Sequence, residues 1–319
     1  MIPRFLFHGA VLVLGAASLM LGSAAAQDAA DEPKEVRFVF YNLKNWLKQP
    51  RTVNGERVAN ASKPEDEKKA LVAMLARIRP EILGICEIGD MSDVNDFKNR
   101  MSGVGIDYEH VHWVDSPDPA RHLALLSQYP IVSTNSQSDL EYEIEGTKEA
   151  VIKLPLWRGI LDATVQINDD YQLRCVGAHL KSKREVDEAD QALMRRNEAH
   201  LLRQHIEKIY DEDPNTNLLV YGDFNDTRNE PPIKAIQGKF GTDRYLWSLK
   251  LEDRDGYRWT HHWEFADIYA RIDFIFVSPG LTREINRDKS FIYYRDDWFT
   301  ASDHRPLVAA IRPVNLDDK

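Results

Sequence analysis

The chain has 319 residues, of which 43% are hydrophobic and 29% are charged. This composition is typical of a folded globular protein and excludes a disordered, collagen-like or coiled-coil chain. The formal net charge of −10 argues against a protein that coats nucleic acid, because an acidic surface repels phosphate polyanions. It does not exclude an enzyme with a small phosphate-binding cleft.

Residues 1–26 have the three parts of a secretory signal peptide. Arg4 supplies a positive charge, residues 10–21 are apolar, and residues 24–26 are three alanines that fit a cleavage site. The apolar part is short for a membrane span. We therefore expect removal of the leader, export to the periplasm or the medium, and no stable membrane insertion afterwards. A retained N-terminal anchor is the alternative.

Short apolar runs predict eight β-strands. Several runs are continuous rather than alternating, which is expected where a sheet is covered on both faces. We expect one domain over residues 36–315, after a flexible lead-in over residues 27–35. In chain order the predicted strands are 36–41, 82–86, 122–127, 160–167, 173–178, 218–221, 272–277 and 307–311.

Three segments predict helices. Residues 62–65 (SKPE) have the spacing of a capping box, and the helix that follows should stop before Pro80. A longer helix is expected over residues 185–210, where apolar side chains recur on one side, and a short helix should begin at Pro231. Together the elements predict an α/β (α+β) protein in which two β-sheets pack face to face beneath outer helices.

The two cysteines, Cys86 and Cys175, both lie in apolar strand-like runs. Such positions favour small buried side chains. Export would permit a disulfide between them, but the sequence does not fix their separation.

Polar residues stand at the ends of the apolar runs. Strand ends that meet at one edge of a sheet bring distant side chains into a single site. Each residue also has an ordinary explanation, such as a cap, a turn, a surface ion pair or, for a histidine, a solvated loop. The ordered set is more informative than any one member: Asn42, Glu87, His179, Asp223, Asn225, Asp273, Asp303 and His304.

These residue types point to metal-assisted chemistry. The carboxylates of Glu87, Asp223 and Asp303 and the amide of Asn42 are oxygen ligands of the kind that Mg²⁺ or Mn²⁺ prefers. A histidine next to an aspartate, as at His304, adds a group that titrates near neutral pH.

The order of the motifs resembles the endonuclease/exonuclease/phosphatase superfamily, which has the DNase I-like fold, in an exported member of bacterial type. The most specific segments are GDFN at 222–225, IDFIF at 272–276 and SDH at 302–304, and the other matching segments are FYNLKNW, ICEIGD, LALLSQYPI and GAHLKSK. The resemblance covers essentially the whole chain after the leader. It implies a four-layered α/β/β/α sandwich of two mixed sheets with the site at one end of the sheets.

The resemblance also implies which residues hold a metal ion. Asn42 and Glu87 would form the first metal-proximal pair, and Asp303 would be a further carboxylate of the metal shell. The implied ion is Mg²⁺ or Mn²⁺, with Ca²⁺ as a structural ion in some members.

The same resemblance implies catalytic roles for five residues. Asp223 and Asn225 would position the attacking water and hold the phosphoryl oxygens. Asp273 would orient His304, whose role as base or as phosphate stabiliser stays open. His179 would bind a phosphate oxygen or protonate the leaving oxygen.

Three basic residues are candidates for contacts with substrate phosphate. Arg158 stands just before a predicted strand, where many relatives carry such an arginine, and a surface ion pair is the alternative. Arg121 precedes the strand at 122–127, and Lys44 follows Asn42; for both, a plain surface position is the alternative.

Two aromatic or histidine-rich segments have less specific readings. His261 and His262 are adjacent, so they point opposite ways in an extended chain, and we expect exposed loop histidines rather than a metal pair. Residues 291–299 (FIYYRDDWF) fit a strand followed by a packed Trp298. The alternative is an exposed aromatic surface that binds a membrane or stacks on bases.

The sequence predicts a divalent-metal-dependent phosphoesterase, first of all a phosphodiesterase or nuclease that hydrolyses DNA or RNA by attack of water. Lys44 stands where abasic-site repair nucleases carry a carboxylate, which argues against DNA repair. One alternative is a sphingomyelinase-like phospholipid hydrolase or a hydrolase of small phosphoesters or inositol phosphates. An alternative of another class is a catalytically silent protein that binds phosphate ligands or a partner. No protein partner is indicated.

Overall fold

The structure is a computed structural model that describes residues 34–148 and 150–315. The predicted leader at 1–26 and residues 27–33 of the lead-in lie outside the described residues. The described part of the chain belongs to one compact unit. Within residues 34–148 and 150–315, no helix combines the length and the apolar character needed to cross a membrane.

Two six-stranded sheets form the centre of the fold, and all eight predicted strands are present in them. In the first sheet β1 and β4 are parallel neighbours and the other pairs are antiparallel. Its order is β17 (Ile285–Ile292), β18 (Leu307–Ile311), β1 (Val36–Trp46), β4 (Ile82–Ile88), β6 (His122–Ser127) and β5 (His110–Trp113).

The second sheet is mixed in the same way. Its parallel neighbours are β11 and β12, and its other pairs are antiparallel. Its order is β13 (Trp247–Ser248), β16 (Asp273–Val277), β12 (Leu218–Asp223), β11 (Tyr171–His179), β10 (Ile160–Asn168) and β7 (Ile131–Thr134).

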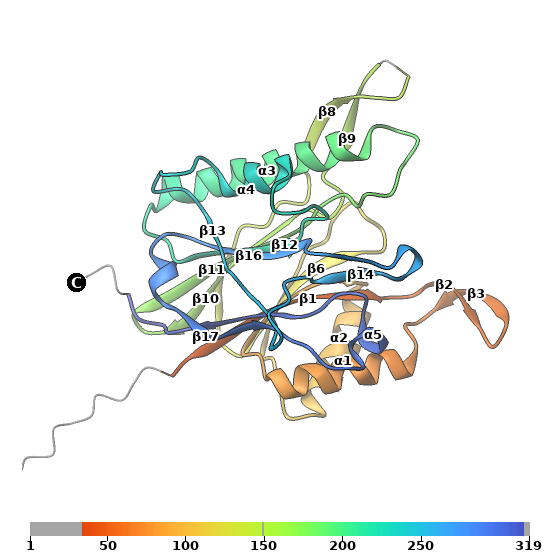
Figure 1. Cartoon of the computed structure of the whole chain (residues 1–319), viewed down its shortest axis with the longest axis horizontal. Coiled ribbons are helices and arrows are strands. Elements are labelled where there is room, and N and C mark those ends of the chain that lie inside the picture. Colours follow the sequence, from red (N-terminus) through yellow and green to blue (C-terminus); the bar gives the residue numbers. More distant parts are fainter. Residues whose placement is uncertain (1–33, 149, 316–319) are drawn as a thin grey trace, which may run out of the picture. The chain divides into compact units, whose positions relative to one another are not determined.

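Helices cover the outer faces of both sheets (Figure 1). Three apolar clusters fill the spaces between layers: one between the first sheet and its helices, one between the sheets, and one between the second sheet and its helices. The layer order is therefore α/β/β/α, as predicted. The helices on the first sheet are α1 (Glu65–Ile78), α2 (Met91–Ser102) and α5 (Trp298–Ala301); those on the second are α3 (Gln191–Glu212) and α4 (Pro231–Gln237).

The alternation along β1 explains its continuous apolar run. Val36, Phe38 and Phe40 belong to the cluster between the sheets, whereas Val39 and Tyr41 pack against the helices. Successive side chains in a strand point to opposite faces, so a strand that is buried on both faces is apolar at every position.

Both cysteines are free and buried. They lie in the cluster between the sheets, Cys86 on β4 and Cys175 on β11. Burial raises the pKa of both thiols, which makes them unreactive at neutral pH. The prediction of two small buried side chains is confirmed.

The structure corrects the starts of two predicted helices and adds two helices that the sequence analysis did not predict, α2 and α5. Ser62 is not a helix cap: α1 begins after Pro64, and no side chain caps it. The long helix begins after Asp190 rather than at residue 185, because the Asp190 carboxylate accepts two N–H groups of the first turn. Helix α2 follows Asp90, which caps it in the same way.

Tyr221 fills the space between the sheets directly behind the ends of the strands. A Cβ added to Gly84 or Gly177 would come within 2.3 Å or 2.7 Å of the Tyr221 side chain, so both positions require glycine. The Tyr221 ring also packs on two phenylalanine rings of β1. Because Tyr221 lies two residues before Asp223, this packing fixes the end of β12.

Three hairpins extend beyond the sheets at the end where β1 finishes (Figure 1). They add polar and aromatic side chains around that end of the fold. The hairpins are β2 (Gln49–Val53) with β3 (Glu56–Ala61), β8 (Glu141–Glu145) with β9 (Val151–Pro155), and β14 (His261–Trp263) with β15 (Ile268–Ala270).

Candidate active site

Strand register brings the polar strand-end residues together at one edge of the two sheets, which we call the site edge. In the second sheet, Asp223 of β12 pairs with His179 of β11 on one side and with Asp273 of β16 on the other. In the first sheet, Asn42 of β1 pairs with the residue before Glu87 of β4. Residues far apart in the sequence thus become neighbours because of the order of the strands.

Asn42 links the two sheets at this edge. Its side-chain nitrogen donates to Glu87 Oε1 (3.3 Å) in its own sheet and to Asp223 Oδ2 (3.1 Å) in the other. Its Oδ1 accepts the backbone N–H of Lys44 (3.0 Å), and Ser302 Oγ donates to its backbone oxygen (2.9 Å). Asn42 therefore presents its nitrogen to the two carboxylates and orients both of them.

The backbone around Glu87 is irregular, and this irregularity directs the Glu87 side chain toward the site. The pairing register shifts on both sides of β4 at this point, and Lys44, Asn45 and Glu87 all have positive φ. Bulges re-aim side chains, and non-glycine residues in this strained region concentrate at functional sites. Asn45 N–H donates to Glu87 Oε2 (2.9 Å). The buried Lys63 ammonium, which the sequence did not reveal, donates to the carbonyl of Lys44 (3.1 Å) and to Glu67 (2.7 Å).

Asp223 is a buried carboxylate between two imidazoles. Its Oδ2 lies 3.6 Å from His179 Nε2 and 3.7 Å from His304 Nε2. Its Oδ1 accepts the backbone N–H of Asn225 (2.9 Å). Burial, and then the negative charge of Asp273, raise the pKa of Asp223 above its ordinary value. A carboxylate with a raised pKa is a suitable proton acceptor near neutral pH.

His304 is held by Asp273 in a buried pair. His304 Nδ1 and Asp273 Oδ2 are 2.8 Å apart, and the backbone N–H of His304 donates to Ser302 Oγ (3.1 Å). Burial alone would lower the pKa of His304, but the charges of Asp273 and Asp223 outweigh it and raise that pKa to about 10. The imidazole is therefore protonated at neutral pH, with Nδ1–H donating to Asp273 and Nε2–H directed to the side of Asp223.

His179 is neutral by contrast. Burial, and then the positive charge of Arg158, lower the pKa of His179 well below its ordinary value. Its Nε2 lies 4.0 Å from Glu87 Oε1. Its Nδ1 is buried and has no hydrogen-bond partner among the described residues. The two histidines at the site thus have different charges, which suits them to different tasks.

A cavity of about 700 Å³ opens over these groups. Asn42 and Asp273 lie behind its wall and act on the residues that face it. Asn225, which has positive φ, donates from its side chain to the carbonyl of Leu180 (3.0 Å) at the same wall. The predicted site residues that line the cavity are Glu87, His179, Asp223, Asn225, Asp303 and His304.

Two of the three basic candidates line the same cavity, Arg121 and Arg158. Asp118 positions both: its Oδ2 lies 3.1 Å from Arg158 Nε, and its Oδ1 accepts the backbone N–H of Arg121 (3.0 Å). Arg158 therefore forms a salt bridge, which was the alternative explanation for it, and it also lines the cavity. Sequence reasoning missed Asp118, because a lone aspartate in a turn carries no pattern. The third candidate, Lys44, lies with Asp303 at a neighbouring groove.

The expectation that His261 is an exposed loop histidine is wrong. His261 lines the cavity, and its ring centroid lies 4.6 Å from that of His304. Burial lowers the pKa of His261 to about 4. His261 forms a β-bridge with His304, and this long-range pairing turns it inward, so no local pattern could reveal its position. His262 points the other way, into the neighbouring groove.

The model of the Endonuclease/Exonuclease/phosphatase family matches residues 53–304. The chain belongs to this family. The endonuclease/exonuclease/phosphatase family includes nucleases, phosphodiesterases and phosphatases, so membership supports a phosphoric ester hydrolase. No curated protein matches the sequence.

Solved structures show the same fold at low identity. The human Nocturnin catalytic domain is 20% identical over 86% of this chain and 93% of its own, with a TM-score of 0.59. A family protein from Bacteroides vulgatus is 16% identical over 88% and 100%, also with a TM-score of 0.59. Truncated Caenorhabditis elegans TDP2 is 13% identical over 87% and 97%, with a TM-score of 0.54. These structural similarities show that the chain has the DNase I-like sandwich fold.

The site edge of this endonuclease/exonuclease/phosphatase family member fits a divalent cation. The side-chain amide of Asn42 donates to both Glu87 and Asp223, so these two carboxylates lie close together. Asp303 is a third carboxylate at the same cavity. Within the described ranges, ligand atoms of Asp223, Asp273 and His304 also lie within 4.8 Å of one another. However, Asp273 and His304 bond to each other, which leaves the other carboxylates as the available hard ligands.

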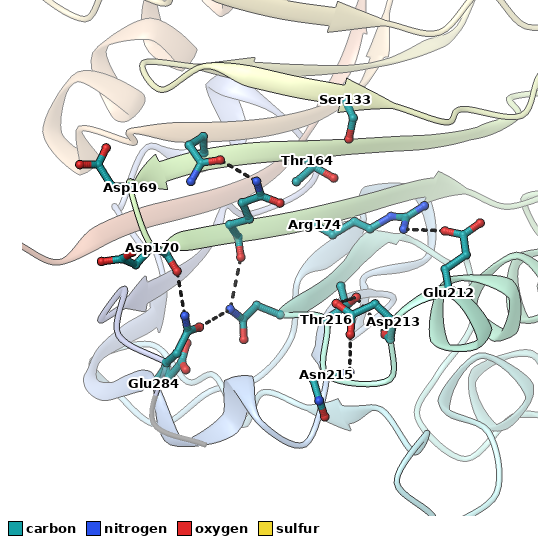
Figure 2. Close-up of a pocket in the computed structure, with 14 residues that line it drawn as sticks. Ser133, Thr164, Asp169, Asp170, Arg174, Glu212, Asp213, Asn215, Thr216 and Glu284 are labelled. Carbon is teal, nitrogen blue, oxygen red and sulfur yellow. Dashed lines mark hydrogen bonds and ion pairs between the residues drawn. The ribbon is translucent and has the colours of Figure 1, made fainter. Parts of the chain in front are cut away.

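A second hollow of about 660 Å³ lies at the opposite end of the second sheet (Figure 2). Its arginine, Arg174, is paired with Asp162 (2.7 Å) and with Glu212 (3.2 Å). No histidine is among the described residues that line it. This hollow therefore lacks the combination of imidazoles and carboxylates that marks the site edge.

Proposed function

We propose that the chain is a divalent-metal-dependent phosphodiesterase that hydrolyses DNA or RNA. The observation that carries the proposal is the buried Asp223 carboxylate between the imidazoles of His179 and His304. A proton acceptor, a cationic imidazole and a neutral imidazole at one cavity provide the proton transfer and the charge stabilisation that phosphodiester hydrolysis needs.

Residues of the chain account for the movement of protons and charge. A water oxygen bonds to phosphorus as the bond from phosphorus to the leaving oxygen breaks, and Asp223 accepts a proton of that water. The imidazolium of His304 donates to a phosphoryl oxygen, where negative charge develops. The leaving alkoxide takes a proton from water in the cavity, and Asp223 returns its proton to solvent, so one water is consumed.

Glu87 and Asp303 would hold Mg²⁺ or Mn²⁺, with Asn42 orienting Glu87. When bound, the ion supplies neutralisation of the charge on the phosphoryl oxygens. Oxygen ligands of this kind suit hard cations rather than soft ones.

Two arginines support a phosphodiester polyanion as substrate. Both line the cavity; Asp118 holds the Arg158 guanidinium and the backbone of Arg121 before any substrate binds, and arginine is well suited to phosphate. They provide local positive charge on a chain of net charge −10. The complete set of site residues argues against a silent binding protein, because a decayed enzyme usually loses one member of the set.

The substrate class is tested with the mature protein in EDTA, Mg²⁺ and Mn²⁺. We expect metal-dependent cleavage of both bis(p-nitrophenyl) phosphate and plasmid DNA. Cleavage of the small ester alone would refute the nuclease and favour a lipid or a small phosphoester as substrate. Absence of turnover of both would refute the phosphodiesterase, and p-nitrophenyl phosphate would then separate a monoesterase from a silent protein.

We also propose that the chain is exported, which the leader-like sequence at 1–26 supports. Protein recovered from the periplasm or the medium of an expressing bacterium should begin near Gln27. A cytoplasmic protein that begins at Met1 would contradict this proposal.

A further inference from the structure

An exposed aromatic cluster borders the site edge on the β14–β15 hairpin. Phe265 is 91% exposed, Phe299 of α5 is 62% exposed, and Trp263 and Tyr269 are about half exposed. Contiguous exposed apolar groups are typical of interaction surfaces and ligand-binding grooves. Trp298, which belongs to the 291–299 segment, is buried as expected, so the exposed surface is formed mainly by a different segment.

These rings line a groove of about 340 Å³. Trp263, Phe265 and Tyr269 come from the hairpin, and Phe299 comes from α5, so two distant segments form its walls. The groove also contains Lys44 and Asp303. Asp303 lines the catalytic cavity as well, and it is bonded to the hairpin, because His262 N–H donates to its carbonyl (2.9 Å). A molecule in the groove is therefore next to the proposed metal ligands.

One of the exposed rings, that of Tyr269, packs firmly against the fold. Tyr269 stacks on His262 with ring centroids 4.2 Å apart and packs edge-on against Trp259 at 4.9 Å. The Arg305 guanidinium lies 3.4 Å from the Trp259 ring centroid, and Arg305 pairs with Asp253 (2.7 Å). Arg305 and Asp253 are buried, so the Tyr269 ring packs against a fixed part of the fold and is held in place before a ligand arrives, which reduces the entropy lost on binding.

We propose that this groove binds an unpaired nucleobase of the substrate, one nucleotide away from the phosphate that is cleaved. The inference rests on the proposed nuclease function and narrows it to single-stranded or frayed nucleic acid. Aromatic faces stack on any base, and a base in a duplex is already stacked on its neighbours. The carboxylates of Glu264 and Asp267 lie on the same hairpin. Their charge disfavours an anionic bilayer and also a phosphate group against the rings, so the part of the substrate that fits there is the uncharged base.

Binding of a fluorescein-labelled single-stranded oligothymidylate to the full mature protein in EDTA tests the groove. Phe265→Ala combined with Phe299→Ala should raise the dissociation constant about tenfold, the effect of losing one stacked base. The matched control is Phe240→Ala, which removes a ring that is 72% exposed and lines neither the groove nor the cavity; its dissociation constant should stay within about twofold of the wild-type value. Wild type, the double variant, each of its two single variants and the Phe240→Ala control should all have the same circular dichroism spectrum.

Kinetics separate this inference from the proposed function. The ratio of kcat/KM for the oligonucleotide to kcat/KM for methyl p-nitrophenyl phosphate should fall about tenfold in the double variant. If the ratio and the dissociation constant were both unchanged, the groove would not bind a base of the substrate, while the nuclease function of the wild-type protein would stand. Failure of the wild-type protein to bind and cleave the oligonucleotide would overturn both. Sedimentation of the wild-type protein with phosphatidylcholine and sphingomyelin vesicles, lost in the double variant, would reassign the hairpin to lipid.

Discussion

Glu198→Gln should change how the stability of the protein depends on pH. Glu198 is a buried residue of α3, and its Oε2 accepts the backbone N–H of Lys181 (2.5 Å) behind the catalytic cavity. Its Oε1 has no hydrogen-bond partner among the described residues. Burial raises the pKa of Glu198 to about 7, against the opposing charge of Arg158. Glutamine keeps an oxygen for the Lys181 N–H but carries no charge.

The direction in which stability changes with pH depends on whether the folded or the unfolded state binds the Glu198 proton more tightly. The folded protein holds the Glu198 proton up to about pH 7, whereas the unfolded chain releases it near its ordinary pKa of 4.5. The group therefore stabilises the fold at low pH, and this stabilisation is lost as pH rises from about 4.5 to about 7. By proton linkage, wild-type unfolding free energy should lose about 2.5 kcal/mol through this group between pH 5 and pH 8.

Guanidinium denaturation at pH 5 and pH 8, in EDTA, measures the difference. The Glu198→Gln variant should lack that loss, so its stability relative to wild type should improve by about 2.5 kcal/mol from pH 5 to pH 8. The control is Glu188→Gln, an exposed carboxylate at the same cavity, which should follow the wild-type trend. Equal pH dependence of Glu198→Gln and wild type would refute the reasoning.

Three further substitutions test the site. Glu87→Gln should shift the Mg²⁺ titration of activity to higher concentration, because a carboxylate ligand is lost; an unchanged titration would remove Glu87 from the metal ligands. Asp273→Asn should lower kcat about a hundredfold or more with the fold intact, because His304 loses the carboxylate that holds and charges it; a kcat within about threefold of wild type would be contrary to that role. Lys63→Met should lower the unfolding free energy by about 1–3 kcal/mol and weaken Mg²⁺ activation, because the Lys44 carbonyl and its turn lose a buried donor. Wild-type values of both stability and Mg²⁺ response would show that Lys63 does not support the turn.

The strands and the layers could be predicted because a strand that is buried on both faces has a continuous run of apolar residues in the local sequence. In β1 every position from Val36 to Tyr41 except Arg37 is apolar and buried, so this run of residues indicates that a layer covers each face of the strand. The polar residues at the ends of such runs could be recognised for the same reason. Their neighbours across the sheet could not be derived from these runs, because the register that sets Asp223 beside both His179 and Asp273 depends on strand order. The contact of Asp273 with His304 was implied only by the family resemblance.

The residues that sequence reasoning missed take their positions from long-range contacts. His261 faces the cavity because it pairs with His304, and Asp118 matters because it meets Arg158 across the fold. Lys63 is buried although lysine favours the surface, since a carbonyl of another segment accepts a hydrogen bond from its ammonium group. The capping-box spacing at 62–65 was misleading because Pro64 stands at the cap position of α1.

The central claim is that the pair of Asp273 and His304, beside Asp223, drives phosphodiester hydrolysis. The most direct measurement is the rate of bis(p-nitrophenyl) phosphate hydrolysis by His304→Ala and by wild type, each in saturating Mg²⁺, with circular dichroism to confirm the fold of both. We predict a rate at least about a hundredfold lower for the variant, the loss expected for an acid–base or phosphate-stabilising group. A folded variant that keeps more than about a tenth of the wild-type rate would contradict the account.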